Sequence, residues 1–306
     1  MRVAVVDIGT NSTRLLVADV ADGRVSQLER HSTVTRLGRG VDTSRQLAPD
    51  AIEDVCRTVG EYIEIYEALD VEKVTAIATS AVRDAENSGA FLAELRERFA
   101  LEARILDGAE EARLVYLGAI TERPAADSTL VVDIGGGSTE LVVGSGEEVR
   151  FYASTQAGTV RHTERYLRTD PPTPSELEAL ADDVRSLIDA ELTGEAIAAA
   201  SEGIAVAGTP TSLAAIDQEL DPYDPERVHG YTLHLDSIQR MYSMLSSKTL
   251  EERLQVKGLH PGRAPTIVAG VVILIQVMRA FGLKEIEVSE HDILYGAALE
   301  TARSPA

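Results

Sequence analysis

The sequence predicts an α/β protein built from two related domains, and three observations support this prediction. Strand-like and helix-like segments alternate along the chain. Residues 5–17 and 131–143 align without a gap and match at nine of thirteen positions, which is an internal repeat. With 306 residues and 44% hydrophobic content, the chain can bury two separate cores. We therefore expect domains at residues 1–124 and 125–306, with the last helix able to pack back on the first domain.

Each copy of the repeat predicts a strand, a tight turn and a second strand. In the second copy an apolar run breaks at Asp133, passes through three glycines and resumes at Leu141. Glycines let the backbone approach a ligand closely, and Ser138 and Thr139 add hydroxyl groups. Such a turn is suited to phosphate oxygens and a hard cation.

The remaining elements of the first half follow from periodicity and turn residues. Strands are expected at 3–6, 14–20, 24–31, 73–78 and 102–106, and helices at 49–68, 87–99 and 110–120. Thr79, Ser80 and Arg83 follow the strand 73–78, at the end where open α/β sheets bind ligands. Arg83 is therefore either a phosphate ligand or a solvated arginine before the next helix.

Adjacent carboxylates at Glu110 and Glu111 open the helix expected at 110–120. Acidic residues in a first helical turn usually serve the helix dipole. This pair also follows a strand end and precedes the expected domain junction, so a carboxylate here could face a cleft.

The second half predicts one strand from residue 129, a second from residue 141, and further strands at 147–153, 204–207 and 285–289. Helices are expected at 160–167, 175–192, from 213 onward, and at 236–245, 249–254, 267–278 and 292–302. The segment Gly208–Ser212 between a strand and a helix is either a second anion-binding junction or an ordinary capped helix start.

The charge balance restricts the partners. Fifty acidic and 29 basic residues give a formal net charge of −21, which repels nucleic acids, anionic membranes and polyphosphates alike. A polyanionic substrate would need a local basic pocket together with metal ions. Five residues are candidate contributors or ordinary surface charges: Arg36, Arg39, Arg161, Lys257 and Arg263.

Neither disulfides nor a membrane anchor is expected. The single Cys56 lies among apolar residues at helical spacing and is expected in a core. The longest apolar run, 267–278, is too short to span a bilayer, which needs about 20 residues. Met1 leads almost directly into a strand, so no targeting segment is expected and the chain is expected to be cytoplasmic.

Several ordered motifs carry a resemblance to known proteins. The two repeat copies, with Gly208–Leu213, resemble the actin, Hsp70 and sugar-kinase superfold. More specifically, Asn11-Ser12 and three further segments resemble the Ppx/GppA family of exopolyphosphatases and guanosine pentaphosphate phosphohydrolases. These segments are Ala78–Arg83, Asp107–Arg113 and Leu259–Arg263. The resemblance implies two ribonuclease H-like domains, with mixed sheets flanked by helices and the active site in the cleft between them.

The resemblance also implies residue roles. Glu111 would be the base that activates water, and Asp7, Asp133 and Glu140 would contact Mg²⁺ or Mn²⁺. Phosphate-binding residues would be Thr10, Asn11, Ser12, Arg83, Gly135, Gly136, Gly137, Ser138 and Thr209. The family's common Leu-Arg-Glu-Gly appears here as Ile293–Gly296, so the role of its arginine and glutamate is in doubt. Compared with longer members of that family, no C-terminal helical extension is expected here.

The expected function is an exopolyphosphatase that releases orthophosphate from the end of inorganic polyphosphate. One alternative is a guanosine pentaphosphate (pppGpp) 5′-phosphohydrolase, and another is a regulator that binds (p)ppGpp without turnover. An ATPase or a sugar kinase on the same fold is less favoured. A second copy of the chain, forming a homodimer, is an expected partner.

Overall fold

The computed structural model describes residues 1–121, 123 and 128–304, which form two compact units. The first unit comprises Met1–Arg123 and the C-terminal segment from Ile293, and the second runs from Pro124 to Asp292. The domain boundary expected at residues 124–125 lies outside the described residues.

A five-stranded mixed sheet forms the centre of the first unit, in the order β3-β2-β1-β4-β5. Its strands are β1 (Arg2–Ile8), β2 (Thr13–Ala21), β3 (Arg24–Thr33), β4 (Lys73–Ala78) and β5 (Ala103–Ile105). The first three strands pair antiparallel, whereas β4 lies parallel to β1 and β5 parallel to β4. The first three strands therefore form an antiparallel meander.

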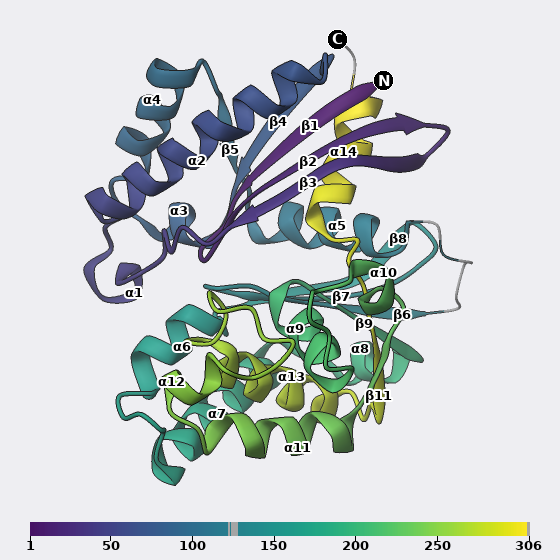
Figure 1. The fold of residues 1–306 in the computed structure, drawn as a ribbon. Coiled ribbons are helices and arrows are strands. Elements are labelled where there is room, and N and C mark those ends of the chain that lie inside the picture. Colours follow the sequence, from purple (N-terminus) through teal and green to yellow (C-terminus); the bar gives the residue numbers. More distant parts are fainter. Residues whose placement is uncertain (122, 124–127, 305–306) are drawn as a thin grey trace. The chain divides into compact units, whose positions relative to one another are not determined.

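Helices cover both faces of this sheet (Figure 1). They are α1 (Val41–Ser44), α2 (Pro49–Ala68), α3 (Ser80–Asp84), α4 (Ser88–Phe99), α5 (Gly108–Ala119) and α14 (Ile293–Arg303). Strand residues alternate between faces, so Ala4 and Val6 join the core under α2, which also holds Cys56. Val3 and Val5 are buried on the opposite face, which α14 covers while it also packs on α5. The C-terminal helix is therefore part of the first unit.

The second unit contains a six-stranded mixed sheet in the order β10-β11-β9-β6-β7-β8. Its strands are β6 (Thr129–Ile134), β7 (Thr139–Ser145), β8 (Glu148–Thr155), β9 (Glu202–Val206), β10 (Thr232–His234) and β11 (Glu285–Val288). As in the first unit, three consecutive strands pair antiparallel and the next strand in sequence lies parallel to the first of them. The sequence repeat is therefore also a repeat of topology.

Helix α13 (Ile267–Ala280) is the central helix of the second core and is buried on most sides. It lies between the sheet and the helices α7 and α11 (Figure 1). The other helices are α6 (Thr159–Tyr166), α7 (Pro174–Glu191), α8 (Gly194–Ala199), α9 (Gly208–Asp217), α10 (Pro225–Val228), α11 (Leu235–Ser246) and α12 (Leu250–Arg253). Among the described residues, no helix is long and apolar enough to cross a membrane.

One expected boundary is wrong. Helix α9 begins at Gly208, whereas the sequence predicts its start near Leu213, after a junction at Gly208–Ser212. The hydroxyls of Thr211 and Ser212 donate to the carbonyls of Ala207 and Gly208, one helical turn back. A hydroxyl cluster that suggests a loop in the sequence is therefore the first turn of the helix.

Candidate active site

The turns of the two repeat copies close with the same hydrogen bond. In the first turn, residues 9–12, Gly9 N donates to Ser12 O over 3.0 Å. In the second turn, residues 135–138, Gly135 N donates to Ser138 O, also over 3.0 Å. A Cβ added to Gly9 or Gly135 would lie only 2.9 or 3.1 Å from that acceptor oxygen, so the tight closure favours glycine at both positions.

The carbonyls of the first turn are held by the segment that follows β3. Thr10 O accepts from Gly38 N over 2.7 Å, and Asn11 O accepts from the amides of Thr35 and Arg36. In a trans peptide the C=O and N–H groups point in opposite directions. The amides of Asn11 and Ser12 therefore point away from residues 35–38, toward the side on which a ligand could bind.

Polar side chains beside the first turn are also available to a ligand. Asn11 Nδ2, Ser12 Oγ and Ser80 Oγ are buried, and none has a hydrogen-bond partner among the residues that the structure describes. Buried polar groups are nearly always hydrogen-bonded in native proteins, so three neighbouring exceptions suggest a missing ligand. All three can donate, as phosphate oxygens require. Thr10 differs, because its Oγ1 accepts from Ala81 N.

The second turn is held by the N-terminus of α6. Gly135 O accepts from Thr159 N over 3.0 Å, and Gly136 O accepts from the amides of Val160 and Arg161. Gly137 O accepts from Arg161 Nε over 2.8 Å. By the same peptide geometry, the amides of Gly136, Gly137 and Ser138 point away from α6. Successive N–H groups directed to one side form an anion-binding site.

The two copies differ at the residue opposite the repeat aspartate. In the first copy Asp7 pairs in register with Arg14, whose guanidinium donates to Asp7 Oδ2 from Nε and Nη2 over 2.8 and 2.6 Å. Asp7, predicted to contact a metal ion, thus has a cationic partner from its own unit. No observation tests that metal assignment, which stays a prediction.

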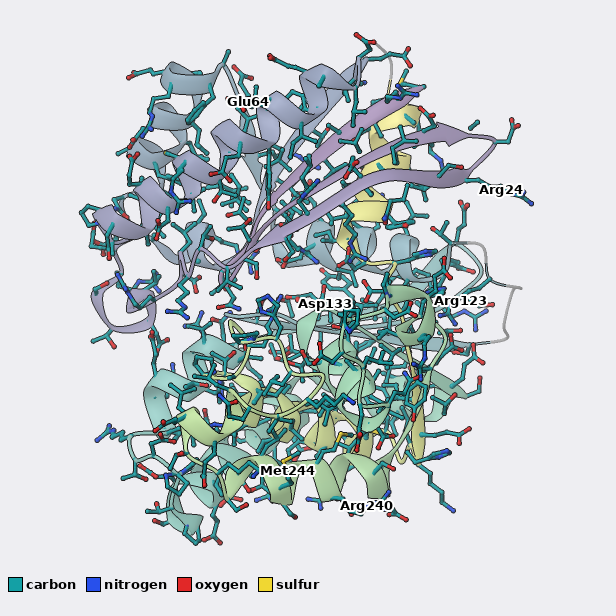
Figure 2. All side chains as sticks on the ribbon, viewed as in Figure 1. Arg24, Glu64, Arg123, Asp133, Arg240 and Met244 are labelled. Atoms are coloured by element: carbon teal, nitrogen blue, oxygen red, sulfur yellow. The ribbon has the colours of Figure 1, made fainter. Side chains whose placement is uncertain are left out.

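In the second copy Asp133 pairs in register with Glu140, so two carboxylates share one face of the sheet. Asp133 lies near the end of β6 (Figure 2), and Ser154 Oγ donates to Glu140 Oε1 over 2.8 Å. Like charges directly opposite each other destabilise a sheet, and a divalent cation bound by both would remove the repulsion. This pair fits the predicted metal site. No group of three or more acidic, histidine or cysteine side chains suited to a metal occurs among the described residues.

Glu111 is held at the start of α5 and is only 7% exposed. Its neighbour Glu110 forms a capping box with Asp107 and an ion pair with Arg104, so Glu110 serves the helix end. Arg83 Nη1 donates to Glu111 Oε2 over 2.9 Å and to Leu106 O over 2.7 Å. Burial raises the pKa of the Glu111 carboxyl above its usual range, while the Arg83 guanidinium opposes this shift.

Thr209 lies away from the second turn in the sequence but in the same unit. It is buried in the first turn of α9, and a Cβ added to Gly270 would lie 2.3 Å from its Oγ1. The Arg263 guanidinium lies against Gly208, since a Cβ there would come within 2.4 Å of Cζ. Among the described residues, no hydrogen bond connects Thr209 with the second turn, so its phosphate-binding role stays a prediction.

Comparisons with known proteins identify the family. A model of the Ppx/GppA phosphatase family matches residues 16–301. The chain belongs to the Ppx/GppA phosphatase family. Exopolyphosphatase 2 of Mycobacterium tuberculosis is 36% identical over 315 residues, covering 98% of each chain. The crystal structure of an exopolyphosphatase-like protein is 32% identical, with a TM-score of 0.93 and 99% of each chain covered.

A further structural relative is the Aquifex aeolicus member of the Ppx/GppA family. It is 30% identical, with a TM-score of 0.83, and the match covers 99% of this chain and 97% of that one. The predicted family and the predicted actin-like fold, with two mixed sheets flanked by helices, are thus confirmed.

Three residues of this Ppx/GppA chain were missed or undervalued from sequence. Arg14 lies in the first repeat copy and has no role predicted from the sequence, yet it holds Asp7. Ser80 was noted but given no role, although its buried hydroxyl lacks a partner among the described residues. Arg161 was treated as a possible surface charge, but it is buried against the second turn. For Arg14 and Ser80 the available signal was position, because both lie in motif segments, whereas Arg161 lies outside them.

Proposed function

We propose that this protein hydrolyses the terminal phosphoanhydride of inorganic polyphosphate and releases orthophosphate. One observation carries the proposal: each unit holds a glycine turn by its carbonyls, which leaves the turn amides directed toward a ligand. Buried donors without a partner among the described residues flank the first of these turns. The likeness to an exopolyphosphatase over nearly the full length supports the same substrate class.

The residues of the turns would neutralise the transferred phosphoryl group. Negative charge on its oxygens is stabilised best by donors that are already in position, because they need no reorganisation during the reaction. In the first unit these donors are the amides and side chains of Asn11 and Ser12, with Ser80. In the second unit they are the amides of Gly136, Gly137 and Ser138.

Glu111 would accept a proton from the attacking water. The water oxygen forms the new bond to the terminal phosphorus, which becomes orthophosphate. The shortened polyphosphate chain leaves with the electron pair of the broken anhydride bond. A base with a raised pKa is a stronger proton acceptor, provided that it is ionised at the working pH. The ion pair with Arg83 favours that ionised form.

Asp133 and Glu140 would hold Mg²⁺ or Mn²⁺. The bound cation would neutralise phosphate oxygens, which matters in a protein with a net charge of −21. The two side chains lie in register on neighbouring strands, so they can act as a pair.

The test of the base assignment compares two adjacent glutamates. Glu111→Gln should lower the rate of phosphate release from polyphosphate with Mg²⁺ by about 10²- to 10⁴-fold, since general-base catalysis contributes about that much. Glu110→Gln is the matched control, because Glu110 caps the helix and is partly exposed. It should retain most of the activity. Near-normal release by Glu111→Gln would refute the assignment.

The test of the metal site measures binding directly. Asp133→Asn and Glu140→Gln should each weaken Mn²⁺ binding, followed by calorimetry or electron paramagnetic resonance, by at least about 10-fold, since each removes an ionised ligand. Exposed Glu148 on β8 supplies the control Glu148→Gln, which should bind normally. Asp7→Asn belongs in the same series, and its ion pair with Arg14 leads us to expect a smaller effect. Unchanged binding in both Asp133 and Glu140 variants would exclude the site.

The alternative substrate, guanosine pentaphosphate, is not favoured by these likenesses. Phosphate release from polyphosphate and from guanosine pentaphosphate by one purified sample would decide between the two enzymes. Tight guanosine tetraphosphate binding with no release under any divalent metal would instead indicate the non-catalytic regulator. A cytoplasmic location and a homodimer belong to the same proposal, and analytical ultracentrifugation would test the second.

A further inference from the structure

We infer that Arg161 is a positioning residue, which holds the second turn from the side opposite the substrate. This inference rests on the proposed function, because it assumes that the amides of the turn bind phosphate. It assigns a role to an arginine that the charge pattern alone leaves as an ordinary surface residue.

The contact of Arg161 with the turn is direct and buried. Its Nε donates to Gly137 O over 2.8 Å, and the residue is only 9% exposed. That carbonyl belongs to the same peptide as the Ser138 N–H, so fixing the oxygen on one side fixes the amide on the other. The backbone amide of Arg161 donates to Gly136 O as well. One residue therefore sets the orientation of two successive peptides.

The packing behind the turn leaves little freedom to reorient. A Cβ added to Gly158, which precedes α6, would lie 2.3 Å from the carbonyl carbon of Gly137 and 2.4 Å from Gly136 O. Gly158 N in turn lies 3.3 Å from Nδ1 of the fully buried His162. The turn thus rests on a close-packed helix start. From α6, the Arg161 side chain donates a hydrogen bond to the turn.

The charge of Arg161 also acts on the turn peptide. A hydrogen bond from a guanidinium is stronger than one from a neutral donor. Hydrogen bonds along a chain polarise each other, so a carbonyl that accepts from a cation makes its peptide N–H a better donor. Ser138 N–H would therefore bind a phosphate oxygen more strongly than an isolated amide.

Three substitutions of Arg161 distinguish a role in positioning the turn from a direct effect of its charge on the substrate. In glutamine the side-chain Nε2 occupies the same place along the chain as Nε in arginine, so Arg161→Gln keeps the donor and loses the charge. Arg161→Lys keeps the charge but has a methylene at that place. Arg161→Met has neither. In the Lys and Met variants Gly137 O loses its donor in a buried site. This loss should lower kcat/KM for polyphosphate by about 10- to 100-fold.

We expect kcat/KM for polyphosphate to be highest in the wild type and lower in Arg161→Gln. It should be lowest, and about equal, in Arg161→Lys and Arg161→Met. Backbone ¹⁵N relaxation of Ser138, measured by NMR, should show more motion of the turn in the Lys and Met variants than in the Gln variant. If Lys is near wild type while Gln and Met are equally impaired, Arg161 acts on the substrate by charge and the inference is wrong. Wild-type kcat/KM in Arg161→Met would also overturn it.

Should the Met variant fail to fold, the comparison of Gln with Lys still decides. A wild-type protein without polyphosphate hydrolysis would refute the proposed function. The relaxation measurements would then still show whether Arg161 holds the turn.

Discussion

Arg83 illustrates how one side chain can serve two roles that the sequence cannot separate. The motif suggested a phosphate ligand, whereas the structure shows its guanidinium on Glu111 and on the carbonyl of Leu106. The two roles are compatible, because a guanidinium has five N–H donors. The effect of Arg83 on the pKa of Glu111 can nevertheless be tested separately from any contact with phosphate.

Removing this guanidinium should shift the pH dependence of the reaction. Arg83 lowers the pKa of Glu111, so Arg83→Met should raise that pKa further. Because the base acts only when ionised, the acidic limb of the kcat/KM profile should move to higher pH, and the loss of activity should be greatest at low pH. Arg104→Met, which removes the partner of Glu110, should leave the limb in place. A uniform loss at every pH would assign Arg83 to the substrate instead.

The choice between the two adjacent glutamates shows what residue types alone leave open. Sequence places both in the first turn of a helix, where either could serve the dipole. The capping box occupies Glu110, while Glu111 is turned into a buried position beside Arg83. That difference depends on side-chain direction, which follows from the exact helix start and is not visible in composition or spacing.

At the scale of elements, the contact between α14 and α5 holds the helix that carries Glu111. A Cβ added to Gly296 would lie 1.9 Å from Leu114 O, so the two helices meet there at backbone distance. The glycine of the segment Ile293–Gly296 is thus explained by packing. Its neighbour Tyr295 donates to Gln27 on β3, which places a structural contact where other family members have a charged residue.

Gly296→Ala should therefore destabilise the first unit. Backbone must move to admit the methyl group, which typically costs about 1–3 kcal/mol. The urea midpoint should fall, and phosphate release should fall with it because α5 shifts. Gly89→Ala is the matched control in the same unit, since no atom lies within 4 Å of its added Cβ. That variant should be neutral or slightly more stable. Equal stability of both variants would show that α14 can move without cost.

Periodicity predicted the elements well where a core face is present. Helix α2 and strand β4 have the predicted bounds, because an apolar stripe and a buried run each end at clear breaks. Strand β10, the short helix α3 and the start of α9 were not predicted. Strand β10 and α3 are too short to show a period, and the first turn of α9 depends on hydroxyl-to-carbonyl bonds that resemble a loop sequence.

For the whole molecule, the net charge of −21 should govern how a polyanion approaches. At an ionic strength of about 0.01 M the screening length is about 30 Å, and it falls to about 8 Å at 0.15 M. At constant free Mg²⁺, kcat/KM for polyphosphate should therefore rise as NaCl is added over this range. Choline chloride serves as a control for effects specific to sodium. A steady decrease would mean that the local basic groups outweigh the overall field.

The return of the chain to its first unit has a consequence for synthesis in the cell. Residues up to Arg123 form all of the first sheet, but α14, which covers one face of that sheet, is made only after the whole of the second unit. Until then the apolar face formed by Val3 and Val5 lacks this cover. The second unit is continuous in sequence and does not include α14, so its core does not depend on that helix. The helix bearing Glu111 therefore completes its packing only once residues 293–303 have been made, so a chain truncated before α14 would contain the second unit but would lack an assembled base.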